Sequence, residues 1–544
     1  MKGLTLASRL LAAAALYATS FAADLDPIVI KASRGSKFFY KTNGTQFFMK
    51  GVAYQRDFSS NGTISGDNKY NDPLADVDGC TRDIPLLQQL QTNTIRVYAL
   101  DPTADHTKCM QLLQDAGIYL IADLGEPATS INRANPEWNT DLYDRYTAVV
   151  DAMQKYSNVL GFFAGNEVSN SANNTVASAF VKAAVRDTKA YISRMKYRSI
   201  GVGYATNDDD TRTLLAEYFN CGPAEEAIDF WGYNIYSWCS DSSYHDSKYD
   251  LRTEEFSTYS VPAFFAEYGC VQAPRLFTEV DSLFGKNMTP VWSGGIVYMY
   301  FQEANGYGLV KVGDDDKATK LGAFSTYSSH IVKADPTGVV SASYNPTNSP
   351  KACPTDTLGG SWQANSTLPP TPNEQLCGCM VSNLTCVAND NLKDQTIQDN
   401  FDYLCDPGVG DYCGGITANG TDGLYGAYSM CSPQERLSWS FNSFYANQTA
   451  NNPDNTTPCD FKGAAKKQTP KLADSCKAIV SQAGGLQGTG TVTSAPTGTG
   501  SSGGSATSSG AAGSITIPRF DFGMLHLALY VMVAGLVGGG MVLL

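Results

Sequence analysis

Eight short apolar segments alternate with longer, helix-like segments between residues 47 and 301 of this 544-residue chain. Apolar runs of this length, bounded by Gly or polar residues, are typical of buried parallel strands. Eight such strands with intervening helices predict a (β/α)8 barrel, an α/β fold in which a closed ring of strands lies inside a ring of helices. The predicted strands are 47–53, 94–99, 118–123, 159–167, 199–204, 229–234, 261–267 and 295–301.

Two of these strands deliver a glutamate to their C-terminal ends. The first reads Phe-Phe-Ala-Gly-Asn-Glu and ends at Glu167, and the second reads Phe-Phe-Ala-Glu-Tyr-Gly around Glu267. The C-terminal ends of the strands form the active-site face of this fold. Two carboxylates that face each other there can cleave a glycosidic bond, and their matched contexts favour this over two solvated glutamates. Polar or aromatic residues also end other strands: Tyr98, Asp123, Tyr204, Asn234 and Tyr236.

The first residues predict entry into the secretory pathway. Lys2 and Arg9 precede an apolar run, and Ser20-Phe21-Ala22 provides small residues at the positions that a signal peptidase reads. The expected signal peptide is therefore 1–22. The chain carries nine Asn-x-Ser/Thr glycosylation acceptors: Asn43, Asn61, Asn173, Asn287, Asn365, Asn383, Asn419, Asn447 and Asn455. Its fourteen cysteines, an even number in a secreted chain, predict disulfides.

The composition changes after the barrel, which we expect to span 23–345. Residues 346–372 are rich in Pro, Ser, Thr and Asn and predict a connector. Residues 373–483 predict a small, mainly helical disulfide module, whose eight cysteines allow 105 pairings. Its cysteines are Cys377, Cys379, Cys386, Cys405, Cys413, Cys431, Cys459 and Cys476; the others are Cys80, Cys109, Cys221, Cys239, Cys270 and Cys353.

The C-terminal residues predict a lipid anchor. A Gly/Ser/Thr-rich stalk at 484–513 precedes a short spacer and an apolar tail at 524–544. Small residues, spacer and tail form a signal for GPI attachment, with Gly510 or Ala511 as the attachment site and 514–544 as the removed propeptide. The alternative is a true membrane-spanning tail. Under the GPI interpretation the protein lies on the outer face of the plasma membrane or in the cell wall.

The charge and the histidines argue against several kinds of partner. The formal net charge of −14 argues against nucleic acid or an anionic membrane as a direct partner, so no nucleic-acid partner is predicted. The four histidines are scattered along the sequence, so no metal site is predicted, and acid/base chemistry with two carboxylates requires no cofactor.

The chain resembles the fungal β-1,3-glucanosyltransferases of glycoside hydrolase family 72 over almost its whole length. The resemblance rests on the two glutamate runs, the Cys-rich module, the stalk and the GPI signal. The module resembles carbohydrate-binding module family 43. The family pattern implies that Cys80 pairs with Cys109, Cys221 with Cys353 and Cys239 with Cys270. It also implies substrate contacts at Tyr98, Asp123, Asn166, Asp208, Arg212, Tyr236, Tyr298 and Tyr307.

We assign Glu267 as the nucleophile and Glu167 as the acid/base of a retaining mechanism. The negative charge of Glu267 is expected to keep Glu167 protonated until the sugar esterifies Glu267. The resemblance implies cleavage of a β-1,3-glucan donor and transfer to a second glucan chain. Two alternatives stay open: an endo-β-1,3-glucanase with the same site, and a non-catalytic protein that binds wall glucan.

Overall fold

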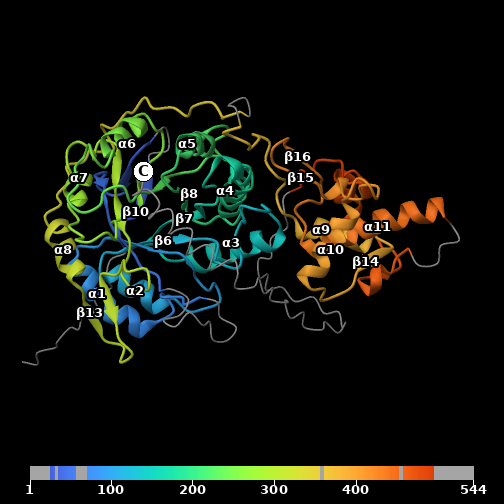
Figure 1. Cartoon of the computed structure of the whole chain (residues 1–544), viewed down its shortest axis with the longest axis horizontal. Coiled ribbons are helices and arrows are strands. Elements are labelled where there is room, and N and C mark those ends of the chain that lie inside the picture. Colours follow the sequence, from blue (N-terminus) through green and yellow to red (C-terminus); the bar gives the residue numbers. More distant parts are fainter. Residues whose placement is uncertain (1–24, 31–34, 57–69, 356–359, 453–457, 495–544) are drawn as a thin grey trace, which may run out of the picture.

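The computed structural model describes residues 25–30, 35–56, 70–355, 360–452 and 458–494. These residues form a large barrel and a smaller module, which lie side by side (Figure 1). The signal peptide, the GPI signal with Gly510 and Ala511, most of the stalk, and the acceptors Asn61 and Asn455 fall outside the described residues.

The barrel is a closed ring of eight parallel strands, as predicted. Each strand pairs with the next along the chain, and the last pairs with the first. The strands are β4 (Met49–Ala53), β5 (Thr94–Val97), β6 (Tyr119–Asp123), β7 (Val159–Asn166), β8 (Gly201–Thr206), β9 (Trp231–Asn234), β10 (Ala263–Tyr268) and β11 (Trp292–Val297).

Helices surround this ring (Figure 1). They are α1 (Val77–Gln89), α2 (Thr107–Asp115), α3 (Thr140–Met153), α4 (Ala177–Arg194), α5 (Arg212–Asn220), α6 (Tyr249–Phe256), α7 (Glu279–Leu283) and α8 (Gly322–Ile331). A hairpin of β12 (Val310–Val312) and β13 (Ala318–Lys320) precedes α8. Asp76 and Asn139 cap the N-termini of α1 and α3 with their side chains, which fixes where these helices begin.

An N-terminal sheet that the sequence analysis did not predict closes the bottom of the barrel. It contains β1 (Ile28–Ile30), β2 (Phe38–Tyr40) and β3 (Gln46–Phe47). The Phe38 ring lies 6.1 Å from the rings of Phe230 and Phe264 inside the barrel. Glycine makes room for Phe230, since a Cβ on Gly203 would lie 2.3 Å from that ring. Within the described residues, aromatic side chains therefore fill this half of the barrel.

The described residues of the module form four α-helices and two short two-stranded sheets. The helices are α9 (Glu374–Ser382), α10 (Asp394–Leu404), α11 (Pro433–Asn451) and α12 (Asp474–Gln482); β14 (Cys386–Ala388) pairs with β17 (Ala465–Lys467), and β15 (Ala418–Asn419) with β16 (Leu424–Tyr425). Four disulfides cross-link it: Cys377–Cys431, Cys379–Cys476, Cys386–Cys459 and Cys405–Cys413.

Residues 484–490, which the sequence analysis assigned to the stalk, pack against the module instead. Gly488 accepts a hydrogen bond from Ala427 at 2.8 Å, and Leu486 accepts one from the Trp439 indole at 2.8 Å. Gly484 and Gly488 adopt positive φ angles, which bend the chain back onto α11. A glycine-rich composition thus conceals a short ordered segment that contributes main-chain acceptors.

The connector runs along the outside of the barrel to the module (Figure 1). Trp362 is fully buried, and its ring lies 4.9 Å from that of Tyr218 on α5. Cys353 is bonded to Cys221, the residue that ends α5. The connector is therefore part of the packed barrel surface. Within the described residues, no helix is both long and apolar enough to cross a membrane.

Candidate active site

Glu267 lies near the C-terminal end of β10 and accepts three hydrogen bonds. Tyr98 donates to Oε1 at 2.9 Å, Tyr236 donates to Oε2 at 2.7 Å, and Arg96 donates to Oε1 at 3.4 Å. The side chain is buried, with 8% of the residue's surface exposed. Both carboxylate oxygens are thus fixed by donors from β5 and from the loop after β9, which orients the group before a substrate arrives.

Arg96 is a fully buried cation behind Glu267, and the sequence analysis did not identify it as a site residue. Its Nε and Nη2 atoms donate to the two carboxylate oxygens of Asp123 at 3.0 and 2.9 Å. The guanidinium also stacks on Tyr98 and Phe163, at 4.2 and 4.6 Å from the ring centroids. Asp123, a predicted substrate contact, therefore also holds Arg96 in place by a bidentate pair.

The environment of Glu267 raises its pKa toward neutral pH. Burial raises the pKa of Glu267 to about 7, and the nearby charge of Glu167 acts in the same direction. Arg96 and the two tyrosine hydroxyls oppose this shift because they stabilise the ionised form. The two carboxyl groups therefore interact electrostatically, as a catalytic pair in one site does.

Glu167 follows the last residue of β7 and has a positive φ of 50°. Its amide donates to Ala205 of β8 at 2.8 Å, and its carbonyl accepts from Arg133 at 2.5 Å. The Nδ2 group of Asn234 donates to Glu167 Oε1 at 2.8 Å and to Asn166 Oδ1 at 3.0 Å. A non-glycine residue in this backbone region is strained, and such strain occurs frequently at functional sites.

Asn234 links the two glutamates through the sheet. It is the register partner of Glu267 between β9 and β10, while its amide contacts Glu167. The sequence analysis noted Asn234 only as a polar strand end. Because the bond from Asn234 occupies Asn166 Oδ1, the predicted substrate contact of Asn166 would be made through its Nδ2 group.

Four predicted tyrosines form one aromatic cluster beside Glu267. The Tyr298 ring lies 6.3 Å from Tyr98, 6.4 Å from Tyr236 and 5.3 Å from Tyr307. Tyr236 and Tyr307 lie 5.7 Å apart. All four residues are partly exposed, and each ring is nearly perpendicular to its neighbours. Such a cluster offers flat apolar faces to the rings of sugars next to a buried carboxylate.

Asp208 and Arg212 belong to a separate ion cluster. Arg252 donates to Asp208 Oδ1 at 3.1 Å, Arg212 donates to Glu255 at 3.2 Å, and the Tyr233 hydroxyl also donates to Asp208. Tyr233 precedes Asn234 on β9, so this cluster supports the strand that carries a site residue. The structure gives these two residues protein partners, and their expected contact with substrate stays a prediction.

The cysteines expected to pair in the barrel are bonded to each other: Cys80–Cys109, Cys221–Cys353 and Cys239–Cys270. The Cys239–Cys270 bond joins the loops after β9 and β10 beside the glutamates. The glycosylation acceptors within the described residues are all exposed or partly exposed, namely Asn43, Asn173, Asn287, Asn365, Asn383, Asn419 and Asn447.

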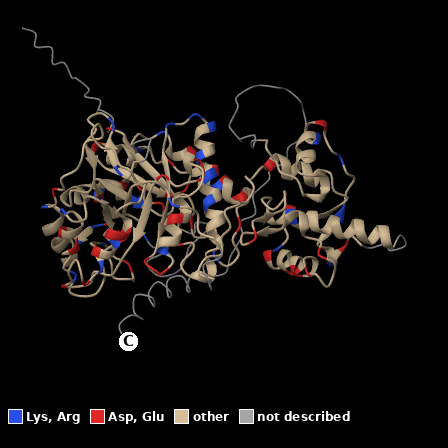
Figure 2. Cartoon of the chain, turned by 90° about the horizontal axis from the view of Figure 1, so that it is seen from above, with Lys and Arg blue, Asp and Glu red and all other residues tan. Residues whose placement is uncertain are grey.

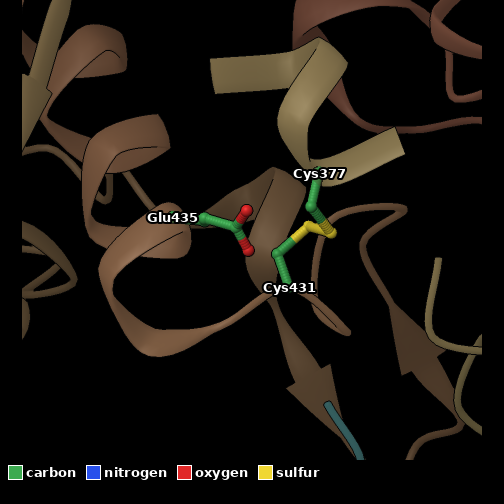
Figure 3. A group of neighbouring side chains, drawn as sticks. All are labelled: Cys377, Cys431 and Glu435. Carbon is green, nitrogen blue, oxygen red and sulfur yellow. A yellow bond between two sulfur atoms is a disulfide. The ribbon is translucent and has the colours of Figure 1, made fainter. Parts of the chain in front are cut away.

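One group of side chains in the described part of the chain has metal-ligating chemistry, formed by Cys377, Cys431 and Glu435 (Figure 3). The two sulfur atoms are bonded to each other, so neither is a thiolate that could bind a cation. Glu435 accepts from the Ser432 amide and hydroxyl at 3.0 and 2.8 Å as the capping box of α11. This group stabilises the module and is not a metal centre.

Acidic and basic residues are interspersed over the barrel and the module (Figure 2). Many basic side chains of the barrel are engaged with protein atoms. Lys182 donates to the carbonyls of Tyr218 and Cys221, and Lys189 pairs with Asp229. The distribution suits a neutral ligand better than a polyanion.

Comparison with known proteins identifies relatives of both parts. The family described as Glucanosyltransferase matches residues 17–335, and the X8 domain matches residues 384–466. A 1,3-beta-glucanosyltransferase of Arthroderma benhamiae is 56% identical over 99% of both chains. The 1,3-beta-glucanosyltransferase gas1 of Schizosaccharomyces pombe is 45% identical over 83% of this chain and 81% of its own.

Solved structures with the same fold include a variant of Saccharomyces cerevisiae Gas2p in complex with laminaritetraose and laminaripentaose. Its TM-score is 0.74 and its identity 42%, over 84% of this chain and 98% of that chain. The likeness therefore extends across the barrel, the connector and the module.

Proposed function

Because this chain belongs to the Glucanosyltransferase family, we propose that it is a retaining transglycosylase that elongates the β-1,3-glucan of the cell wall. It cleaves one glucan internally and transfers the new reducing end to the non-reducing end of another. The observation that carries this proposal is the pair of glutamates at the ends of β7 and β10. One of them, Glu267, accepts from three donors, two of which belong to the cluster of four tyrosines.

In the first step, Glu267 attacks the anomeric carbon of the donor sugar. Glu167 gives its proton to the glycosidic oxygen, and the reducing-end fragment leaves as an alcohol. The donors on Glu267 favour its ionised form and aim it, so little motion is needed in the transition state. Asn166 donates to a hydroxyl of the bound sugar, a contact that strengthens as positive charge develops on the ring.

In the second step, a hydroxyl of the acceptor glucan replaces the leaving group. Glu167, now a carboxylate, removes its proton while the oxygen attacks the anomeric carbon and releases Glu267. The tyrosines favour transfer over hydrolysis because stacking holds a sugar where water would otherwise enter. The resemblance to glucanosyltransferases, rather than the two glutamates, distinguishes transfer from hydrolysis.

Sizing the products made from reduced laminari-oligosaccharides tests this function. Transfer gives products longer than the substrate. Products that are only shorter would establish an endo-β-1,3-glucanase, and an unchanged substrate would establish a binding protein.

We further propose that the mature protein begins after residue 22 and is held by a GPI lipid attached at Gly510 or Ala511. This places the barrel at 23–345, with its module, on the outer face of the plasma membrane or in the wall. The exposure of the described Asn-x-Ser/Thr acceptors supports glycosylation there. Release of the protein from cells by a phosphatidylinositol-specific phospholipase tests the anchor, because a membrane-spanning tail would resist that enzyme.

A further inference from the structure

Arg275 lies in the loop after β10 and binds four main-chain carbonyl oxygens. Its Nε donates to Cys270 at 3.1 Å, and its Nη2 donates to Gly269 at 3.1 Å, both within its own loop. The same guanidinium reaches the loop after β11, where Nη1 donates to Tyr307 at 2.7 Å and Nη2 donates to Tyr298 at 3.1 Å. One side chain thus joins the loop that follows Glu267 to the loop that carries two of the clustered tyrosines.

The guanidinium is also fixed by aromatic rings. It lies 4.6 Å from the ring centroid of Phe277 and 5.6 Å from that of Tyr307. A planar fork that donates through all of its nitrogens and stacks on rings loses little freedom when it binds. Arg275 therefore helps to fix the Tyr298 and Tyr307 main chains, together with the bonds from the Tyr298 amide to Tyr268 and from the Met299 amide to Tyr307.

We infer that Arg275 is a positioning residue that sets how often the glycosyl-enzyme reacts with a glucan instead of water. This inference rests on the proposed transglycosylase function. Tyr298 and Tyr307 stack edge to face at 5.3 Å, next to the Tyr236 that donates to Glu267. A small shift of the two main chains moves both rings, and a misplaced acceptor reacts more slowly while water is unaffected.

The acceptor, rather than the donor, is the substrate most sensitive to this arrangement. Glu267 accepts from Tyr98, Tyr236 and Arg96, whereas the carbonyls that accept from Arg275 belong to Gly269, Cys270, Tyr298 and Tyr307. Loss of Arg275 therefore affects bond cleavage less than transfer. A residue with only a general structural role would lower both rates together.

The test compares Arg275→Lys with Arg198→Lys in the full chain. Arg198 is a matched control, since it also binds main-chain carbonyls, those of Tyr156 and Val159 at 2.9 and 2.6 Å, but at the N-terminal end of β7. Lysine keeps the charge in both variants but lacks the planar fork through which arginine donates from several nitrogens. The measured quantity is the ratio of transfer to hydrolysis products from reduced laminari-oligosaccharides across a series of acceptor concentrations.

We expect Arg275→Lys to lower this ratio by about tenfold and to raise the acceptor concentration needed for half-maximal transfer. Arg198→Lys should leave the ratio unchanged. A wild-type ratio in Arg275→Lys, or an equal fall in cleavage and transfer, would overturn this inference but not the proposed function. Absence of longer products from the wild-type protein would instead overturn the proposed function, and this inference with it.

Discussion

Glu267 is held in two opposing ways, and the balance between them determines the pH range in which it acts. Its three donors stabilise the carboxylate, while burial and the charge of Glu167 favour the protonated form. The net result is a pKa of about 7. A nucleophile that is both oriented and partly desolvated is more reactive than a solvated carboxylate, because less solvent must be displaced before it attacks.

Glu167→Gln and Glu267→Gln are each expected to lower the rate of glucan cleavage by about 1,000-fold or more, since each removes one half of the acid–nucleophile pair. Glutamine keeps the volume of the side chain, so the thermal unfolding midpoint should change little. Asp209→Asn is a suitable control, because Asp209 lies in the loop that begins α5 and makes local hydrogen bonds to Thr211. Near-wild-type turnover in either folded glutamine variant would refute the assignment.

The pH dependence should report ionisation of the nucleophile. Glu267 attacks the sugar only in its ionised form. Since the pKa of Glu267 is raised to about 7, the ionised fraction falls as the pH drops through that value. We expect kcat/KM for neutral laminari-oligosaccharides to fall by about tenfold per pH unit below about pH 7.

Glu167→Gln provides the matched control for this pH profile. The Glu167 charge raises the pKa of Glu267, so its removal should shift ionisation of Glu267 to lower pH. An aryl β-laminarioside with a good leaving group needs no acid catalyst, and its burst rate in this variant measures the nucleophile alone. A wild-type activity that stays constant as the pH falls from 7 to 5 would contradict the raised pKa of Glu267.

The sequence predicts those candidate site residues that end a strand, because the strand pattern gives them a common location. Glu167, Glu267, Tyr98 and Tyr236 are predicted in this way, and the structure brings them together. Arg96 was missed, although it lies on β5 two residues before Tyr98, a spacing that places two side chains of an extended chain on one side. Arg275 has no comparable signal, since its partners are main-chain carbonyls whose positions depend on the fold.

At the scale of elements, the strands of the barrel were predicted because each is a continuous apolar run between helices. The boundaries differ by a few residues, as for β11, which begins at Trp292 rather than at 295. The N-terminal sheet was missed because its strands are only two or three residues long and carry no periodic pattern. The packing of 484–490 was hidden for a similar reason, since glycine contributes only main-chain contacts.

The connector shows how an irregular segment can stabilise a regular one. Trp362 is buried against Tyr218, and its indole donates to Ala364 at 2.8 Å. Trp362→Ala is expected to lower the free energy of unfolding by about 3–5 kcal/mol, because it leaves a large cavity on α5. Trp362→Phe keeps an aromatic ring but loses the indole hydrogen bond, and it should lower the free energy of unfolding by about 1–2 kcal/mol.

Chemical denaturation with the disulfides intact measures both values. A loss below about 1 kcal/mol for Trp362→Ala would show that the connector only covers the barrel without stabilising it.

At the scale of the whole molecule, the module contacts the barrel through apolar and polar pairs. Arg436 of α11 forms an ion pair with Glu137 at 2.6 Å, and the Thr140 amide at the start of α3 donates to Met430 at 3.0 Å. The ring of Tyr425 lies 6.1 Å from that of Phe180 on α4. These contacts, together with the short connector, favour a module that braces the barrel, in addition to any contact with glucan.

Deletion of the module tests bracing against binding. A 23–372 fragment keeps Cys353 and therefore its bond to Cys221. Phe180 is 2% exposed in the full chain, and deletion uncovers the part of its ring that faces Tyr425, which should cost at most about 1.5–3 kcal/mol; loss of the polar contacts adds to this. We expect a lower unfolding midpoint and poor secretion of the fragment.

Phe180→Ser provides the control that separates the two roles, since it removes the exposed apolar ring from the fragment. If bracing acts by covering α4, this substitution should partly restore secretion of the 23–372 fragment while destabilising the full chain. If the module serves only to bind glucan, the unmodified fragment will be secreted, will unfold at the wild-type temperature and will cleave short oligosaccharides normally. It will then lose only its retention on insoluble β-1,3-glucan, and the bracing role will have been excluded.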